Sequence, residues 1–93
     1  MSTATEITET EIWLRVIQPR NGDLSPEAAR EWLRLRLSNT DTERVRELSH
    51  KADEGTLTQD EERELDAYLN VGSVLDLLKA KARLSLNKTK TSV

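Results

Sequence analysis

The stretch that decides the fold runs from Gly55 to Leu86 and reads GTLTQDEERELDAYLNVGSVLDLLKAKARLSL. It contains no proline, and its apolar residues recur at the three- and four-residue spacing of one helical face. Thr58 and Glu61 have the spacing of a capping box, in which each side chain satisfies an exposed amide at a helix start. We therefore expect one helix from Gln59 to about Leu86. Gly72 in its interior marks either a bend or the close approach of another helix.

The segment before this helix predicts a second helix that folds back against it. Thr40 and Glu43 also fit a capping box. Gly55 is a good residue to end the helix that starts there. Because the connector from Gly55 to Thr58 is short, the two helices should form an antiparallel hairpin.

Two shorter helices are expected nearer the N-terminus. Residues 9–18 read ETEIWLRVIQ, and their apolar residues share one helical face, although the β-branched ones also suit a strand. Ser25 and Pro26 predict the start of the next helix, whose apolar stripe continues to Leu37. The sequence thus predicts an all-α fold: a small four-helix domain in which the first two helices pack against a C-terminal hairpin with a long last helix. Its expected parts are a disordered N-terminus (1–8), a single helical domain (9–86) and a flexible basic tail (87–93).

The composition predicts a thin core and few kinds of chemistry. Apolar residues make up 35% of the 93 residues and charged residues 33%, which suits slender helices or a core completed by a partner. There is no Cys, which excludes disulfides and thiol chemistry, and no Phe. The acidic N-terminus does not resemble a signal peptide, and no apolar run is long enough to span a bilayer. We expect a cytoplasmic protein without membrane association.

No catalytic or metal-binding constellation stands out. His50, the only histidine, has Asp53 and Glu54 at helical spacing, but no second His or Cys completes a metal site. The acidic residues from Asp60 to Asp66 begin a helix, where carboxylates stabilise the helix dipole without any catalytic role. The three glycines are isolated, so no phosphate-binding loop exists. The sequence predicts neither an enzyme nor a bound cofactor or metal.

The leading hypothesis is a non-catalytic protein-binding module. Residues 41–66 carry a net charge of −6 and residues 67–93 a net charge of +4. Residues 74–86 are apolar on more than one side, which implies cover by the domain itself or by another chain. The candidate partner interface combines apolar and acidic residues: Leu75, Leu77, Leu78, Leu84, Leu86, Asp60, Glu61, Glu62 and Glu64.

Two alternatives stay open. A nucleic-acid-binding accessory protein would use basic residues near the C-terminus as phosphate contacts. These candidates are Lys79, Lys81, Arg83, Lys88 and Lys90. Because the overall charge is negative, direct nucleic-acid binding is the less favoured hypothesis. The other alternative is a self-assembling helical protein, a homo-oligomer whose fourth helix pairs with its own copy.

Three runs together resemble a known group of proteins. They are Leu24–Leu33 (LSPEAAREWL), Gly55–Leu69 (GTLTQDEERELDAYL) and Val71–Leu86 (VGSVLDLLKAKARLSL). The sequence resembles short bacterial all-helical proteins without assigned activity, whose genes often lie beside one for a small HNH-type endonuclease. The resemblance covers about residues 12–86 and supplies no functional residues. It implies a protein partner, an HNH-type nuclease, with this chain as its companion or antitoxin-like inhibitor.

Overall fold

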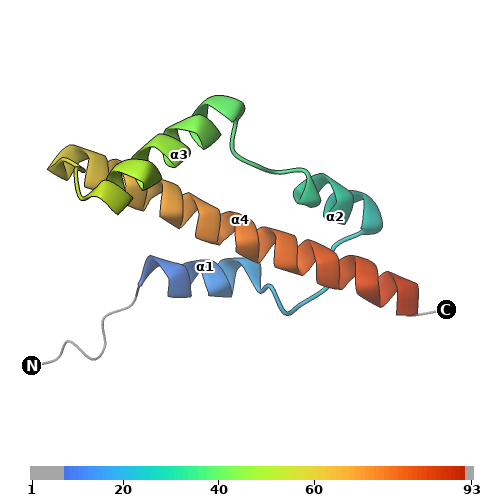
Figure 1. Cartoon of the computed structure of the whole chain (residues 1–93). Helices are drawn as coiled ribbons and strands as arrows, with labels where there is room; N and C mark the ends of the chain where they lie inside the picture. Colours follow the sequence, from blue (N-terminus) through green and yellow to red (C-terminus); the bar gives the residue numbers. More distant parts are fainter. Residues whose placement is uncertain (1–7, 92–93) are drawn as a thin grey trace, which may run out of the picture. The chain divides into compact units, whose positions relative to one another are not determined.

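The computed structural model describes residues 8–91, with side chains through Lys88, and confirms the all-α fold. Within that range there are helices and connecting segments but no strand, so the segment after Thr8 is helical. Most of the expected disordered N-terminus, residues 1–7, lies outside the described residues. The helices are α1 (Glu9–Ile17), α2 (Pro26–Leu33), α3 (Asn39–Glu54) and α4 (Gln59–Thr91), drawn in Figure 1.

Local capping explains where three of the helices begin. The predicted cap of α2 is confirmed, because the Ser25 hydroxyl accepts a hydrogen bond from the Ala28 amide and Pro26 follows it. The predicted capping box of α4 is also confirmed. The Thr58 hydroxyl accepts from the Glu61 amide at 3.1 Å, and the Glu61 carboxylate accepts from the Thr58 amide at 3.0 Å. A further capping box, formed by Thr8 and Glu11, begins α1.

The start of α3 differs from the prediction. Its N-cap is Ser38, whose hydroxyl accepts from the Asp41 amide at 3.1 Å, so Thr40 lies inside the helix. Ser38 is itself a strong N-cap residue, and capping there lengthens the helix by a further half-turn. The far end agrees with the prediction: α3 stops at Gly55, whose φ of 70° is the left-handed conformation that glycine adopts without a Cβ penalty.

Two other helix ends differ from expectation. Helix α2 ends at Leu33, and Leu35 is 42% exposed, so the apolar stripe does not continue to Leu37. Helix α4 continues to Thr91, past its expected end near Leu86 and through the first part of the expected flexible tail. No glycine or proline follows Leu86 to stop it. Residues 92 and 93 lie outside the described range.

The chain divides into two compact units, and α4 contributes to both. Unit 1 comprises residues 1–35 and 73–93, and unit 2 comprises residues 36–72. A single domain over residues 9–86, with the first two helices packed against the hairpin, stays a prediction.

Unit 2 is the predicted helical hairpin, and polar contacts join its two helices. Leu48 on α3 is fully buried. Beside it, the Arg44 guanidinium donates two hydrogen bonds of 2.8 Å to the Glu64 carboxylate. The Tyr68 hydroxyl donates to the Asp41 carboxylate at 2.7 Å, which raises the pKa of Tyr68. The helices of this hairpin are thus joined by ion pairs and hydrogen bonds as well as by apolar packing.

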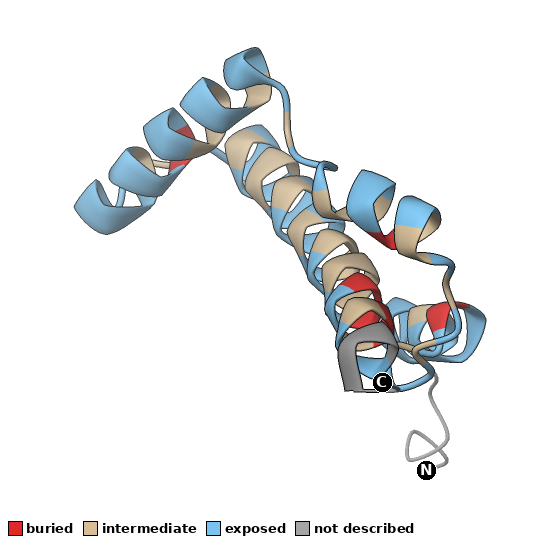
Figure 2. Ribbon diagram, turned by 90° about the vertical axis from the view of Figure 1, so that its right-hand side faces the viewer, coloured by how far each residue is buried: buried red, intermediate tan, exposed pale blue. Residues whose placement is uncertain are grey.

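Unit 1 places α1 and α2 beside the later part of α4 (Figure 1). Its buried apolar residues are few and mostly small: Ile17, Ala29 and Ala82. In Figure 2, buried residues, polar ones included, appear as a few red patches on ribbons that are otherwise half-buried or exposed. Because the apolar core is so small, unit 1 depends on close backbone packing and on buried polar contacts.

Gly22 is the site of one such close approach. A Cβ at this position would lie 3.0 Å from the Leu84 carbonyl carbon and 2.9 Å from the Lys88 Cδ atom. The segment between α1 and α2 therefore packs directly on the α4 backbone. Gly72 is different: in the described part of the chain, nothing lies within 4 Å of a Cβ built there, so close helix packing does not explain it.

We expect opposite effects when these two glycines are replaced by alanine. Gly22→Ala should lower the free energy of unfolding by about 1–3 kcal/mol, because the added methyl group forces the backbone away from α4. Gly72→Ala should raise it by roughly 0.5–1 kcal/mol, because alanine favours a helix interior and meets no neighbour. Urea unfolding followed by circular dichroism measures both. A Gly22→Ala variant as stable as the wild type would contradict the close approach.

Candidate binding surface on α1 and the following turn

A tight turn follows α1 and fixes the direction of the chain. Gln18 adopts the left-handed conformation with φ of 53°, and its amide donates to the Leu14 carbonyl at 2.9 Å. The Asn21 amide then donates to the Gln18 carbonyl at 2.9 Å. The two side-chain amides also meet, because Asn21 Nδ2 donates to Gln18 Oε1 at 3.0 Å. A non-glycine residue with positive φ is uncommon, so this turn depends on the contacts that surround it.

The strongest of those contacts comes from Lys81 on α4. Its side chain is almost fully buried, and its ammonium group donates to the Ile17 carbonyl at 2.8 Å. It also forms an ion pair of 3.0 Å with the Asp23 carboxylate, and its hydrogen bond lowers the pKa of Asp23. The Ile17 carbonyl belongs to the last turn of α1, where the helix dipole favours a positive charge. Lys81 therefore holds both the end of α1 and the segment after it.

Ser85, one turn further along α4, holds the same segment at a second point. Its hydroxyl group is buried, accepts from the Leu24 amide at 3.1 Å and donates to the Lys81 carbonyl at 2.8 Å. With the close approach at Gly22, the chain from Ile17 to Leu24 is fixed to α4 at successive positions. The turn is thereby held as a rigid scaffold for the side chains that it exposes.

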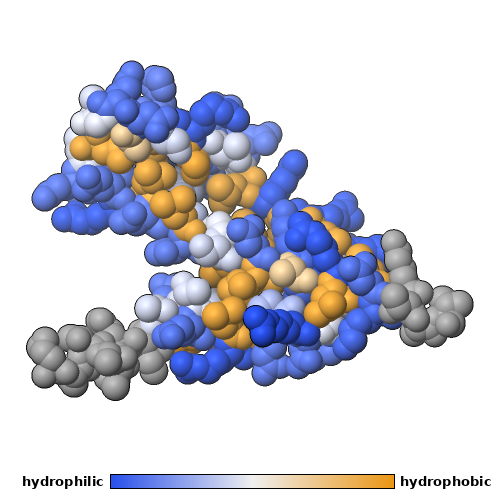
Figure 3. Space-filling model, turned by 60° about the horizontal axis from the view of Figure 1, so that its bottom comes forward, coloured by the Kyte–Doolittle hydropathy of each residue, from blue (hydrophilic) through white to orange (hydrophobic). Residues whose placement is uncertain are grey.

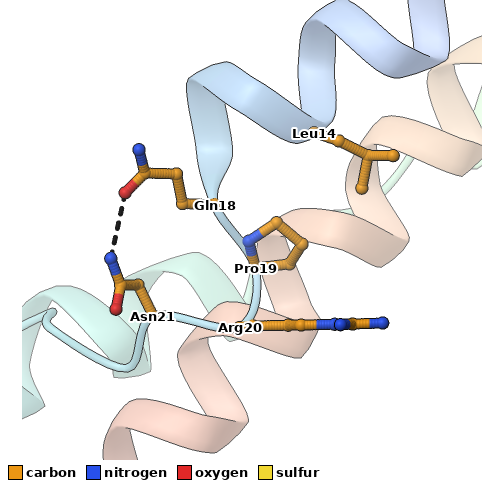
Figure 4. Close-up of a pocket in the computed structure, with 5 residues that line it drawn as sticks. All are labelled: Leu14, Gln18, Pro19, Arg20 and Asn21. Atoms are coloured by element: carbon orange, nitrogen blue, oxygen red, sulfur yellow. Dashed lines mark hydrogen bonds between the residues drawn. The ribbon is translucent and has the colours of Figure 1, made fainter.

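This turn borders a hollow of about 470 Å³, lined by Leu14, Gln18, Pro19, Arg20 and Asn21. Figure 4 shows the Leu14, Pro19 and Arg20 side chains on one side of the turn and the bonded pair of amides on the other. Arg20 is exposed, and no hydrogen bond or ion pair holds its guanidinium group within the described part of the chain. The hollow thus combines an apolar wall with an available positive charge.

Helix α1 also exposes apolar side chains. Ile12 is 49% exposed and Val16, one turn later, is 68% exposed, while Leu14 beside the hollow is 41% exposed. Among the described residues of α1, only Ile17 is buried. Figure 3 shows apolar side chains at the surface on the side where α1 lies, among hydrophilic ones. Ile12 and Val16 share one face of the helix, so a single surface of another molecule can cover both.

The leucines predicted as a partner interface are not openly exposed. All five are half-buried within unit 1, and Leu84 packs against the Gly22 segment. These leucines are Leu75, Leu77, Leu78, Leu84 and Leu86. Cover by the domain itself, one of the two explanations given by the sequence, accounts for much of their apolar surface.

The four acidic residues predicted for the same interface have different surroundings. Glu61 accepts a hydrogen bond from the Lys51 ammonium, and Glu64 is bound by Arg44, so both take part in the hairpin. Asp60 and Glu62 are exposed, and Asp60 pairs with Arg63 one turn away. The paired charges of Glu61 and Glu64 are therefore already compensated within unit 2.

The predicted phosphate contacts are also divided. Lys81 is buried against Ile17 and Asp23, so it is not available to a phosphate group. Lys79 is half-buried, Arg83 and Lys88 are exposed, and the side chain of Lys90 lies outside the described residues. The structure thus excludes Lys81 as a phosphate contact.

Sequence reasoning missed the roles of Lys81 and of the turn residues, though a signal existed for Lys81. Leu78, Lys81, Ala82 and Ser85 follow each other at the spacing of one helical face, which places the lysine within an apolar stripe. Such a position predicts a buried lysine with a specific partner. No comparable pattern marks Arg20, which the sequence shows only as part of a turn.

Within the described residues, no three His, Cys, Asp or Glu side chains gather as a metal site requires. His50 pairs with Glu54 at 3.3 Å, and both side chains are exposed. No helix in that same range is long and apolar enough to cross a membrane.

Comparisons with known proteins give no family for this chain. No protein-family model, no curated protein and no solved structure matches it.

We expect Lys81→Met to release the turn. Methionine keeps the apolar stem but leaves the Ile17 carbonyl without its charged donor, which costs about 1.5–3 kcal/mol. Hydrogen exchange of the amides from Gln18 to Leu24 should accelerate in this variant. Lys79→Met, which changes a half-buried lysine on the same helix, should leave these amides protected. Unchanged exchange in Lys81→Met would contradict the anchoring role.

The ion pairs of the hairpin predict a loss of stability in acid. Lys51 and Arg44 lower the pKa values of Glu61 and Glu64 below the ordinary 4.5. Because the folded state favours the charged forms, their contribution is fully present above pH 4.5 and is lost as the pH falls through the lowered values. Glu64→Gln should lower the urea midpoint at pH 6 and reduce its fall below pH 4.5. Glu62→Gln, at an exposed position that forms no ion pair with any described residue, is the control and should change neither quantity appreciably.

Proposed function

We propose that this chain is a non-catalytic protein-binding module and that α1 carries its binding surface. The observation that supports this most directly is the exposure of Ile12 and Val16, which lie one turn apart on the same helix. Their burial by a partner would be favourable, since a fully buried aliphatic side chain gains about 1.5–3 kcal/mol over an exposed one.

The partner class comes from two considerations. A nine-residue helix with one buried side chain offers a convex apolar surface, which suits a groove on another protein. The resemblance to proteins encoded beside HNH-type nucleases makes such a nuclease the first partner to test, in the cytoplasm of a bacterium. This identification of the partner depends on the resemblance alone.

The α1 surface replaces two parts of the interface predicted from the sequence. The leucines of α4 are half-buried within unit 1, so a partner gains less by covering them than by covering Val16. Of the acidic residues predicted for that interface, Glu61 and Glu64 are already paired with cations. Asp60 and Glu62 remain as the exposed acidic residues of the predicted set. Nucleic-acid binding and self-assembly through α4 stay alternatives that no feature of the described residues favours.

The test is an affinity pull-down from native extract with a matched pair of variants. The wild type and Leu69→Ser, which changes a 58%-exposed leucine in unit 2, should recover the same partner. The double variant Ile12→Ser/Val16→Ser should lose it, because each lost apolar contact costs about 1 kcal/mol or more. With the purified partner, binding should weaken roughly tenfold or more.

Three results would reject this proposal. Undiminished recovery by the Ile12/Val16 double variant would exclude the α1 surface. Recovery of the bait alone, with light scattering that shows concentration-dependent oligomers, would favour self-assembly. Recovery of nucleic acid that moderate salt removes would favour the nucleic-acid alternative.

A further inference from the structure

We propose that the hollow beside the α1–α2 turn binds a short peptide segment of the partner in which an apolar side chain adjoins an aspartate or glutamate side chain. The apolar group contacts Leu14 and Pro19, and the carboxylate pairs with Arg20. This inference rests on the proposed function, since it names the chemistry that a protein partner brings to one part of the surface. It assigns a role to Arg20, which the fold itself does not use.

The geometry of the hollow supports both halves of the ligand. Its volume of about 470 Å³ lies in the usual range for ligand sites, roughly 300–1,000 Å³. The Leu14 side chain and the Pro19 ring border it on the same side of the turn as the Arg20 side chain (Figure 4). A ligand seated there would therefore meet apolar carbon atoms and a guanidinium group together.

The charge of the site selects an anionic group. The Arg20 guanidinium is exposed and, in the described part of the chain, has no carboxylate partner. Some arginines of this chain, such as Arg44 with Glu64 and Arg34 with Glu31, are paired with a nearby acid, whereas Arg20 keeps its charge for a ligand beside the hollow. Guanidinium groups bind carboxylates in a planar two-point geometry, which favours a carboxylate over a neutral amide.

The backbone of the turn favours a side-chain carboxylate over a chain terminus. Capture of a C-terminal carboxylate generally uses several free backbone amides. Here the Gln18 amide is bonded to the Leu14 carbonyl and the Asn21 amide to the Gln18 carbonyl, and Pro19 has none, so the turn offers too few free amides to surround a terminal carboxylate. Arg20 is therefore the principal donor that the turn offers, and it suits the mobile carboxylate of an aspartate or glutamate.

The rigidity of the turn makes a weak contact effective. Lys81 and Ser85 hold the segment from Ile17 to Leu24, so little backbone order has to be gained on binding. Ordering a flexible loop would otherwise oppose association. The anchored turn thus presents Leu14 and Arg20 in a fixed relation to each other.

Blocked dipeptides test this inference on the full chain by NMR titration. Acetyl-Leu-Glu-amide should shift the amide signals of residues 14–21, apart from Pro19, with a millimolar dissociation constant. Acetyl-Leu-Gln-amide, which lacks the charge, and acetyl-Ala-Glu-amide, which lacks the apolar side chain, should each bind about three- to fivefold more weakly, the range of an exposed ion pair or a small apolar contact. Arg20→Gln should lower the affinity for acetyl-Leu-Glu-amide to that for acetyl-Leu-Gln-amide. The affinity for acetyl-Leu-Gln-amide should stay unchanged. Arg34→Gln is the control variant.

Several outcomes would overturn the inference. These are equal binding of the charged and neutral dipeptides, shifts that map away from residues 14–21, an unchanged affinity in Arg20→Gln, and no shift at all at saturating peptide. Tighter binding of acetyl-leucine, which has a free C-terminal carboxylate, would show that the hollow binds a chain terminus and not an aspartate or glutamate side chain. These outcomes of the titration are independent of the pull-down. If the Ile12/Val16 variant loses the partner, the proposed function is upheld even when the dipeptides do not bind as expected.

Discussion

The buried ammonium group of Lys81 is the contact on which unit 1 depends. A charge removed from water is costly unless it is paired and hydrogen-bonded, and Lys81 finds both conditions at the Ile17 carbonyl and the Asp23 carboxylate. The carbonyl carries the partial negative charge of the α1 terminus. The Lys81 ammonium group therefore satisfies the end of this helix, and its own positive charge is compensated there. Removing either partner would leave a buried polar group without its hydrogen bond. The contact therefore ties α1, the turn and α4 together.

Unit 2 shows the same response to a shortage of apolar residues. With nearly as many charged as apolar residues in the sequence, its two helices meet through Leu48 and through polar pairs such as Arg44 with Glu64. Paired charges add little net stability over well-packed apolar groups, but a misaligned pair leaves a charge uncompensated. The pairs between α3 and α4 therefore favour one register of the hairpin, because a shifted register would separate the charges.

The sequence predicts this fold where the decisive interactions are local. The caps at Ser25 and Thr58 and the glycine end at Gly55 involve residues within four positions, and all are confirmed. The start of α3 was wrong because Ser38 and Thr40 are both good caps in one short segment, and local rules do not choose between them. The apolar stripe of α4 marks Lys81 as a buried position, but its partners lie about 60 residues away, so no local pattern identifies them. The same limit hid the hollow, whose shape depends on that anchor.

An anchored turn and an uncovered helix together argue for binding through α1 and against binding through α4. The leucines of α4 already gain part of their possible burial within unit 1, so a partner that covered them would add little. Val16 has most of its surface still to bury, and Arg20 has its whole charge still to pair. Both lie within five residues of each other, on either side of the Ile17 carbonyl that Lys81 holds. A single contact from α4 therefore holds in place an exposed apolar side chain and an unpaired positive charge, both of which a partner can cover.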